Sequence, residues 1–238
     1  MANLQLTWLG HGGILYRAPD GTHLWVDRWT GGPTYPAAFG TPERVDVIAP
    51  THGHYDHVGE NCKDVTELAA GREDVTVVCS HEMSIYLGAH GVEAVGMNKG
   101  GTVEAGGVRL TMVHADHSGG ATITGGGAAQ VTRDLGVWGW VLEFGDGTVV
   151  YHAGDTDLFG DMALVRERFA PSIAVLPIGG HYTMGPRDAA RAVELLGVST
   201  VVPVHFGTFP VLAGTPDELR GHTSATVVSL APGETWQA

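Results

Sequence analysis

The sequence predicts a mixed α/β protein whose two halves each carry several strands followed by strand–helix units. Short apolar runs typical of strands alternate with turn signals rich in glycine, proline and aspartate from the start of the chain. Segments with helical spacing and terminal proline or glycine signals follow in each half. Two such halves packed face to face would form a four-layer αββα sandwich, although periodicity alone establishes only the mixed α/β class.

The first half contains most of the expected strands. Three apolar runs separated by tight turns predict an antiparallel meander, and two later runs predict buried strands. A helix is expected over residues 83–89, and a Gly-Gly dipeptide joins two runs into an expected hairpin. In chain order, the expected strands are residues 4–8, 14–16, 23–26, 45–49, 75–79, 103–105 and 108–113.

The segment at residues 118–136 is rich in glycine, alanine and threonine and has no clear periodicity. It is too long for a plain connection, so we expect a binding loop or a mobile lid, and we favour a loop at the mouth of a site. The second half then alternates strands and helices. The expected strands are residues 138–144, 148–151, 173–177, 201–204 and 226–230, and the expected helices are residues 162–169, 186–196 and 216–221.

Length and composition indicate one domain that spans residues 1–238. Apolar residues make up 43% of the chain and charged residues 16%, which excludes a disordered protein. The apolar runs fall short of the roughly 20 residues that a bilayer span needs. The first residues lack the basic region and apolar block of a signal peptide, so we expect a cytoplasmic protein.

The charge balance argues against polyanionic partners. The chain has 13 basic and 26 acidic residues, a formal net charge of −13, and no basic run or tail. Nucleic-acid binding depends largely on lysine and arginine that neutralise phosphates, and anionic membrane surfaces attract basic segments. We therefore expect a small-molecule substrate and no nucleic acid or membrane partner. The exposed edges of a sandwich are compatible with a homo-oligomer.

The strongest functional signal is the run His52-Gly-His54-Tyr-Asp56-His57, which follows the expected strand at residues 45–49. On an extended backbone His52 and His54 project to the same side. A turn after them can direct Asp56 and His57 toward a second point, so four ligands in six residues suit two adjacent metals better than one. Imidazole and carboxylate suit zinc, and with less preference manganese, iron or nickel. A polar loop with chance histidines would leave three imidazoles in one tight turn without a role.

This run resembles the HxHxDH signature of the metallo-β-lactamase superfamily, which implies a four-layer αββα fold and a dinuclear metal site. The resemblance implies a third histidine for the first metal in the segment at residues 114–118, where His117 is the better match and His114 the alternative. It also implies a bridging aspartate and a last histidine, each after a strand. The implied ligands are His52, His54 and His117 for the first metal, Asp56, His57 and His205 for the second, and Asp155 as the bridge.

Three further segments narrow the resemblance: Trp8-Leu-Gly-His11, residues 96–101 and residues 176–186. They are similar to a compact branch of metal-dependent hydrolases that is akin to ascorbate-6-phosphate lactonases and, more distantly, to N-acylphosphatidylethanolamine phospholipase D. The likeness runs from Trp8 to Phe209 and covers most of the chain.

The resemblance implies cleavage of an ester, lactone or related small-molecule bond by a hydroxide shared between two divalent ions. Zinc is the expected metal, with Mn²⁺, Fe²⁺ or Ni²⁺ as alternatives. In this reaction Asp155 would hold the two ions at the required separation, and Asp56 would orient one of them and its water.

Three further residues are candidates for substrate contact. His181 lies in a glycine-rich turn before a helix, where it could act in catalysis by donating to an oxyanion or bind a substrate carboxylate, or else pack as a turn residue. His11 could support the ligands or contact substrate, or be satisfied by loop backbone. Tyr55 could line the pocket or face solvent.

Three other functions fit parts of this pattern. A small-molecule phosphodiesterase would use the same metals. A non-catalytic metal-binding protein would be expected to have lost ligands, yet all seven expected ligands are present. A redox diiron protein of this fold would place a carboxylate where His54 stands and would add a flavin-binding domain. Hydrolysis is therefore the favoured function.

Overall fold

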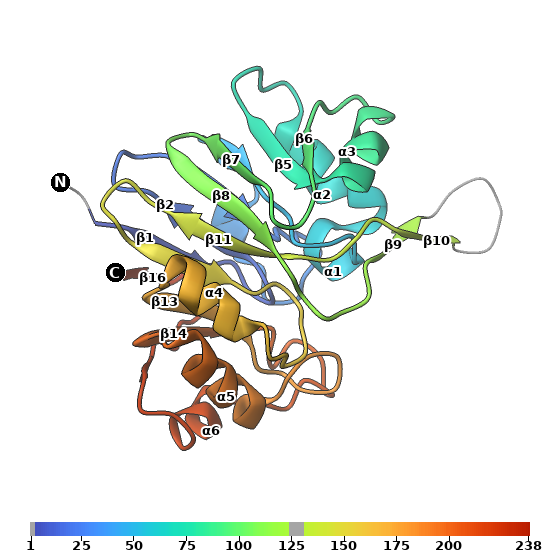
Figure 1. Ribbon diagram of the computed structural model, residues 1–238. Helices are drawn as coiled ribbons and strands as arrows, with labels where there is room; N and C mark the ends of the chain where they lie inside the picture. Colours follow the sequence, from blue (N-terminus) through green and yellow to red (C-terminus); the bar gives the residue numbers. More distant parts are fainter. Residues whose placement is uncertain (1–2, 124–130) are drawn as a thin grey trace.

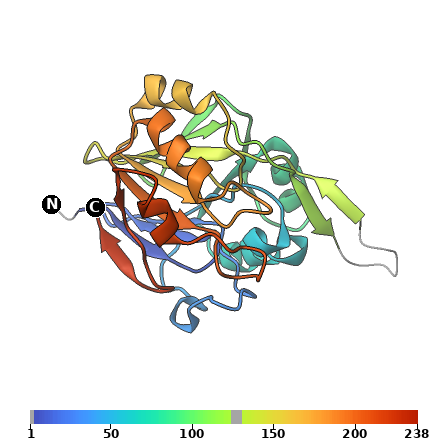
Figure 2. The same cartoon turned by 90° about the horizontal axis from the view of Figure 1, so that it is seen from below.

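The computed structural model describes residues 3–123 and 131–238, and its centre is formed by two seven-stranded β-sheets packed face to face (Figures 1 and 2). In spatial order, the first sheet consists of β16 (Thr235–Gln237), β1 (Gln5–Trp8), β2 (Ile14–Arg17), β3 (His23–Val26), β4 (Val47–Ile48), β5 (Thr76–Ser80) and β6 (Val95–Met97). The second sheet consists, in its own spatial order, of β15 (Thr226–Val227), β14 (Thr200–Val204), β13 (Ile173–Pro177), β12 (Val149–His152), β11 (Gly139–Glu143), β8 (Val108–Val113) and β7 (Thr102–Ala105).

Helices cover the outer face of each sheet and complete the four-layer αββα sandwich expected from the sequence (Figure 1). The helices beside the first sheet are α1 (Tyr55–Val58), α2 (Lys63–Ala69) and α3 (His81–Gly88). The helices beside the second sheet are α4 (Met162–Phe169), α5 (Pro186–Leu196) and α6 (Pro216–Arg220). Among the described residues, none of the helices has the length and apolar content to cross a membrane.

Each sheet combines antiparallel and parallel pairing. Strands β1, β2 and β3 form the predicted antiparallel meander, and β7 and β8 form the predicted hairpin. From β3 to β6 and from β12 to β15, neighbouring strands run parallel. Parallel strands end at the same edge of a sheet, so the loops that follow β3, β4, β12 and β14 can meet in one region.

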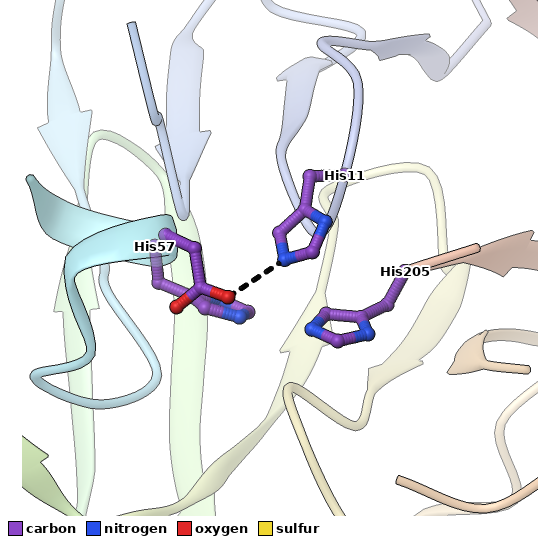
Figure 3. Close-up of side chains that lie close together, drawn as sticks. His11, His57 and His205 are labelled. Carbon is purple, nitrogen blue, oxygen red and sulfur yellow. Dashed lines mark hydrogen bonds and ion pairs between the residues drawn. The ribbon is translucent and has the colours of Figure 1, made fainter. Parts of the chain in front are cut away.

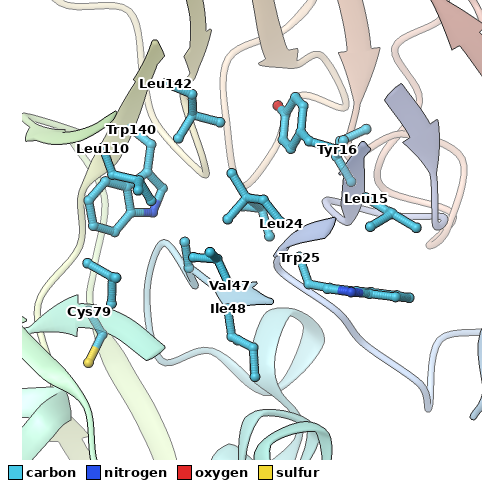
Figure 4. Close-up of a cluster of buried hydrophobic side chains, with 14 of the residues drawn as sticks. Leu15, Tyr16, Leu24, Trp25, Val47, Ile48, Cys79, Leu110, Trp140 and Leu142 are labelled. Carbon is cyan, nitrogen blue, oxygen red and sulfur yellow. The ribbon is translucent and has the colours of Figure 1, made fainter. Parts of the chain in front are cut away.

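The core between the sheets explains why the halves stay together. Leu24 and Val47 of the first sheet lie opposite Leu110, Trp140 and Leu142 of the second, all essentially without solvent contact (Figure 4). Successive residues of a strand face opposite sides of the sheet. Val141 of β11 and Tyr151 of β12 therefore face outward and pack against α4 and α5. Burial of each large side chain stabilises the fold by about 1.5–3 kcal/mol.

Several elements differ from the sequence prediction. Residues 118–136 are not a plain loop, because β9 (Gly120–Ile123) and β10 (Val131–Asp134) pair there as an antiparallel ribbon that projects from the body (Figures 1 and 2). Glycine, alanine and threonine carry too little apolar alternation to reveal such strands. The tip of the predicted loop lies outside the described residues. The short elements α1, α2, β6 and β16 were not predicted either, and β15 is shorter than the expected strand at 226–230.

A buried polar pair crosses the core between the sheets. The hydroxyl of Tyr16 on β2 lies 2.7 Å from Nδ1 of His152 on β12, and both side chains are at most 1% exposed. Burial lowers the pKa of His152 to about 4, from the ordinary value of 6.5. Between these two pH values the unfolded chain therefore binds a proton at this position that the folded chain does not.

We expect the free energy of unfolding to fall as the pH decreases from 6.5 toward 4. By linkage, His152 alone accounts for a loss of about 2 kcal/mol between pH 7.5 and pH 5. Urea unfolding at pH 7.5 and pH 5, with a chelator present, measures this loss of unfolding free energy. In His152→Asn the loss should be smaller than in wild type by about 2 kcal/mol. The control His81→Asn, which removes an exposed histidine, should retain the wild-type pH dependence; a His152→Asn variant with the same dependence would contradict the assignment.

Candidate metal centre

The candidate ligands lie on loops that leave the carboxyl ends of strands. The HxHxDH run follows β4 and continues into α1, where His54 is the N-cap residue. His117 lies between β8 and β9, Asp155 follows β12, and His205 follows β14. The first of these loops belongs to the first sheet and the others to the second, so the packing of the two sheets brings them together.

Three histidines form a first cluster. Ring nitrogens of His52, His54 and His117 all lie within 4.8 Å of one another, and His52 Nε2 is 2.9 Å from His54 Nδ1. Burial lowers the pKa of all three imidazoles, so they are held in the neutral form that binds metals. His114, the alternative to His117, lies instead on the surface against Phe159, with ring centroids 4.8 Å apart.

A second cluster consists of Asp56, His57, His205 and His11, whose ligand atoms again lie within 4.8 Å of one another (Figure 3). His11 Nε2 is 3.1 Å from Asp56 Oδ2, and the rings of His11 and His205 are 3.9 Å apart. Burial would raise the pKa of Asp56. The hydrogen bond from His11 and the charge of the neighbouring His57 outweigh burial, so the pKa is lowered. Asp56 is therefore ionised beside three imidazoles.

Asp155 lies between the clusters. Its Oδ2 atom is 3.3 Å from His57 Nε2, 3.0 Å from His205 Nε2 and 3.6 Å from His117 Nε2. Burial would raise its pKa, but His205 and His57 outweigh that effect and keep the pKa well below its ordinary value. One ionised carboxylate thus contacts histidines of both clusters.

The donor atoms fit divalent cations. His57 Nε2 and both ring nitrogens of His205 are buried and have no hydrogen-bond partner, although two of them approach Asp155. Buried polar atoms are normally satisfied, so ring nitrogens without partners beside a carboxylate are placed to act as ligands of a cation. Imidazole and carboxylate donors are the set that transition-metal dications prefer.

Asp27, which the sequence analysis missed, fixes the orientation of His57. Its Oδ1 accepts from the Thr51 backbone N–H at 2.8 Å, and its Oδ2 accepts from the Thr51 hydroxyl at 2.6 Å and lies 2.9 Å from His57 Nδ1. A carboxylate accepts only, so His57 Nδ1 carries a proton that points to Asp27. Burial would lower the pKa of the His57 imidazole, but Asp155 and Asp27 outweigh it and raise the pKa well above its ordinary value. A cation bound at Nε2 would replace the proton that faces Asp155, while Asp27 would keep the proton on Nδ1. The available signal was an aspartate directly after a buried strand, the position that the other ligands occupy.

Three residues of the candidate centre share an uncommon backbone conformation. His11, Asp27 and His205 have φ values of 49°, 50° and 54°, in the left-handed region that non-glycine residues rarely adopt. Such conformations cost about 1–3 kcal/mol each and cluster at functional sites. Gly12 permits the approach of this loop, because a Cβ at that position would lie 2.6 Å from His57 Cε1.

His11 is a buried residue of the centre and not a surface residue. It is 1% exposed, its Nδ1 lies 3.0 Å from the Thr208 hydroxyl, and its carbonyl accepts from the backbone N–H of His205 and from Trp8 Nε1. Burial lowers its pKa to about 4, against the opposing hydrogen bond to Asp56. The neutral ring therefore donates from Nε2 to the Asp56 carboxylate.

The other two candidates for substrate contact lie outside both clusters. Tyr55 is 41% exposed, with its ring edge-on to Trp29 at 5.8 Å. His181 is exposed, has a φ of 60°, and packs its ring against Tyr182. The structure does not place His181 among the ligands, and its catalytic role stays a prediction.

Comparison with known proteins agrees with this architecture. The sequence profile described as Beta-lactamase superfamily domain matches residues 25–206, a range that runs from β3 to the loop after β14. The chain belongs to the metallo-β-lactamase superfamily. The match includes the HxHxDH run, His117, Asp155 and His205.

Full-length relatives lie within the same superfamily. The chain is 46% identical to a UPF0173 metal-dependent hydrolase of Koribacter versatilis over 99% of both proteins. It is 41% identical to another of Methanosarcina mazei over the full length of both. Among solved structures, Igni18, a metallo hydrolase from Ignicoccus hospitalis, is 32% identical with a TM-score of 0.85, covering 100% of this chain and 99% of its own.

We expect the substitution Asp27→Asn to lower the affinity of this protein for zinc by about 10- to 100-fold. An amide can donate to His57 Nδ1, which would then place the proton on Nε2, the atom that faces the second cluster. Competition with a fluorescent zinc chelator would measure the affinity. Asp64→Asn is the matched control, because Asp64 is a buried carboxylate that holds Thr30 and contacts no candidate ligand. Equal affinities in the two variants would contradict the role of Asp27.

We expect His11→Asn to lower the metal content of the second cluster. Asparagine tolerates the left-handed backbone, but its shorter side chain loses the bond to Asp56. Inductively coupled plasma mass spectrometry of the purified protein should show fewer ions per chain than in wild type. His181→Asn, which changes another left-handed histidine outside the clusters, should keep the wild-type content. A full complement of ions in His11→Asn would overturn this role.

Proposed function

We propose that this protein is a hydrolase that holds two divalent ions and cleaves an uncharged ester or lactone bond. The observation that carries the proposal is the position of Asp155, whose buried carboxylate contacts histidines of two separate ligand clusters. A carboxylate between two imidazole-rich clusters would be placed to hold two ions close together, as in two-metal hydrolytic sites. The relatives at 40–46% identity carry the name metal-dependent hydrolase, which supports the reaction class.

We assign each ligand to an ion by its cluster. His52, His54 and His117 would hold one ion, and Asp155 would lie between the two ions. Asp56, His57 and His205 would hold the second ion, and His11 would orient Asp56 through its hydrogen bond. Zinc suits this set of imidazole and carboxylate donors, with manganese, iron and nickel as alternatives.

When bound, two divalent ions lower the pKa of a shared water to near neutrality and polarise the bond to be cleaved. The protein's own groups prepare this chemistry. Asp27 keeps the proton of His57 on Nδ1, and His11 fixes one oxygen of Asp56, so the remaining lone pairs face the centre. The Asp56 side chain is 16% exposed and that of His117 is 12% exposed, so the centre opens to solvent on their side.

The charge around the centre favours an uncharged bond over a phosphodiester. Within the described part of the chain, no lysine or arginine forms a hydrogen bond or ion pair with a residue of either cluster. Phosphate recognition commonly uses arginine or lysine as partners of the anionic oxygens. The net charge of −13 further disfavours accumulation of anions at the surface.

The proposal is tested by metal content and hydrolysis measured on the same preparations. We expect about two divalent ions per wild-type chain, and hydrolysis of phenyl acetate or a γ-lactone that exceeds hydrolysis of bis(p-nitrophenyl) phosphate. Asp155→Asn should lose metal and reduce hydrolysis by at least about 100-fold, because both clusters lose their shared ligand. Asp157→Asn, two residues along the chain and exposed, is the matched control and should retain both properties.

Two results would contradict the proposal. Fewer than one ion per chain after reconstitution with zinc or manganese would exclude the dinuclear centre. A loaded protein that hydrolyses the phosphodiester faster than the ester and the lactone would point to a phosphodiesterase instead.

A further inference from the structure

Three aromatic side chains from separate segments of the chain contact one another or His11 beside the second ligand cluster. Trp29 lies 5.2 Å and Phe209 lies 5.6 Å from the His11 ring, both with an edge-on geometry. Trp29 also contacts Phe209, at 6.0 Å, and Tyr55, at 5.8 Å. We call Trp29, Tyr55 and Phe209 the aromatic wall. The aromatic wall adjoins the candidate metal centre, because two of its rings contact His11 and because Tyr55 directly precedes Asp56.

The aromatic wall is accessible to solvent. Trp29 and Phe209 are half-buried, and Tyr55 is 41% exposed. Tyr182, on the loop between β13 and α5, and Val211, on the loop after β14, are also among the few large apolar side chains exposed in the described residues. Grouped exposed apolar side chains of this kind mark binding sites rather than ordinary surface.

The wall is also held in place from behind. The backbone of Gly32 packs on the Trp29 indole so closely that a Cβ would lie 2.8 Å from Cε3. Phe209 is fixed in a turn, because its carbonyl accepts from the Leu212 N–H at 2.9 Å. Phe209 also lines a hollow of about 490 Å³ formed by residues 206–210 and 212–216. A rigid aromatic surface that borders a hollow can bury a ligand group with little loss of side-chain entropy.

We infer that the aromatic wall binds an apolar alkyl or aryl group of the substrate and directs the adjoining ester or lactone carbonyl to the metal centre. This inference rests on the proposed hydrolase function and adds its substrate class: acyl esters or lactones with an apolar substituent of several carbons. The wall consists of uncharged rings, so the contact is apolar burial and ring stacking rather than ion pairing. Trp29 and Phe209 are thereby specificity residues.

The test measures binding of carboxylates, the product class, separately from hydrolysis. Acetate, hexanoate and phenylacetate are titrated into the metal-loaded protein by calorimetry. In wild type we expect hexanoate and phenylacetate to bind at least about tenfold more tightly than acetate, because only they reach the wall. Phe209→Ala and the more exposed Tyr55→Ala should each reduce this ratio by about threefold or more. Leu164→Ala, on the surface of α4, is the control and should keep the wild-type ratio.

Hydrolysis of phenyl acetate and phenyl hexanoate by the same variants, together with metal content, completes the experiment. A wall that binds substrate predicts a preference for the hexanoate in kcat/KM that falls in parallel with the binding ratio while the metal content is kept. Equal ratios in wild type, Phe209→Ala and Tyr55→Ala would overturn the inference even if esters are hydrolysed. A shifted binding ratio without ester hydrolysis would instead support the wall and contradict the proposed reaction.

Discussion

The structure around the candidate metal centre depends on the burial of one charge. Asp155 is 3% exposed, and its Oδ2 lies within 3.0–3.6 Å of ring nitrogens of His57, His117 and His205. A buried carboxylate is tolerated only beside groups that compensate its charge, so its position determines where three loops must meet. One of those loops leaves the first sheet and two leave the second. The apolar core between the sheets and the polar cluster at their edge are therefore parts of one arrangement.

Residues outside the two clusters, or at their edge, hold some of the ligand side chains in place. Asp27 holds His57 and is itself held by two bonds from Thr51, which immediately precedes the HxHxDH run. His11 bonds Asp56 through its ring and receives the backbone N–H of His205 at its carbonyl. His57 and Asp56 are thus each oriented by a residue from a distant part of the chain, which limits the movement of their donor atoms when a cation binds or leaves.

Local signals in the sequence predicted a large part of this fold. The helices at residues 162–169 and 186–196 and the strand between them have the expected bounds, because proline and glycine mark the ends of α5 clearly. The HxHxDH run is also local, so its resemblance to a known signature pointed to the residues that the structure brings together. The superfamily and the αββα layers were predicted correctly from that run.

Features that depend on contacts between distant residues were not accessible in this way. Asp27 carried only the weak signal of an aspartate after a buried strand, and Trp29 carried none; their roles come from contacts with His57, His11 and Phe209. The ribbon of β9 and β10 lacks apolar alternation, and α1 is a single turn that begins inside the histidine run. In each case tertiary pairing, rather than intrinsic propensity, determines the local structure.

The left-handed backbone at His11, Asp27 and His205 limits which ligand chemistry this scaffold can acquire. Asparagine, aspartate and histidine are several-fold enriched in that conformation, whereas longer or branched side chains are strained there. A histidine at these positions can therefore be exchanged for aspartate or asparagine more readily than for a β-branched side chain. Redesign of the centre toward oxygen ligands, which harder cations such as manganese prefer, is therefore compatible with the backbone.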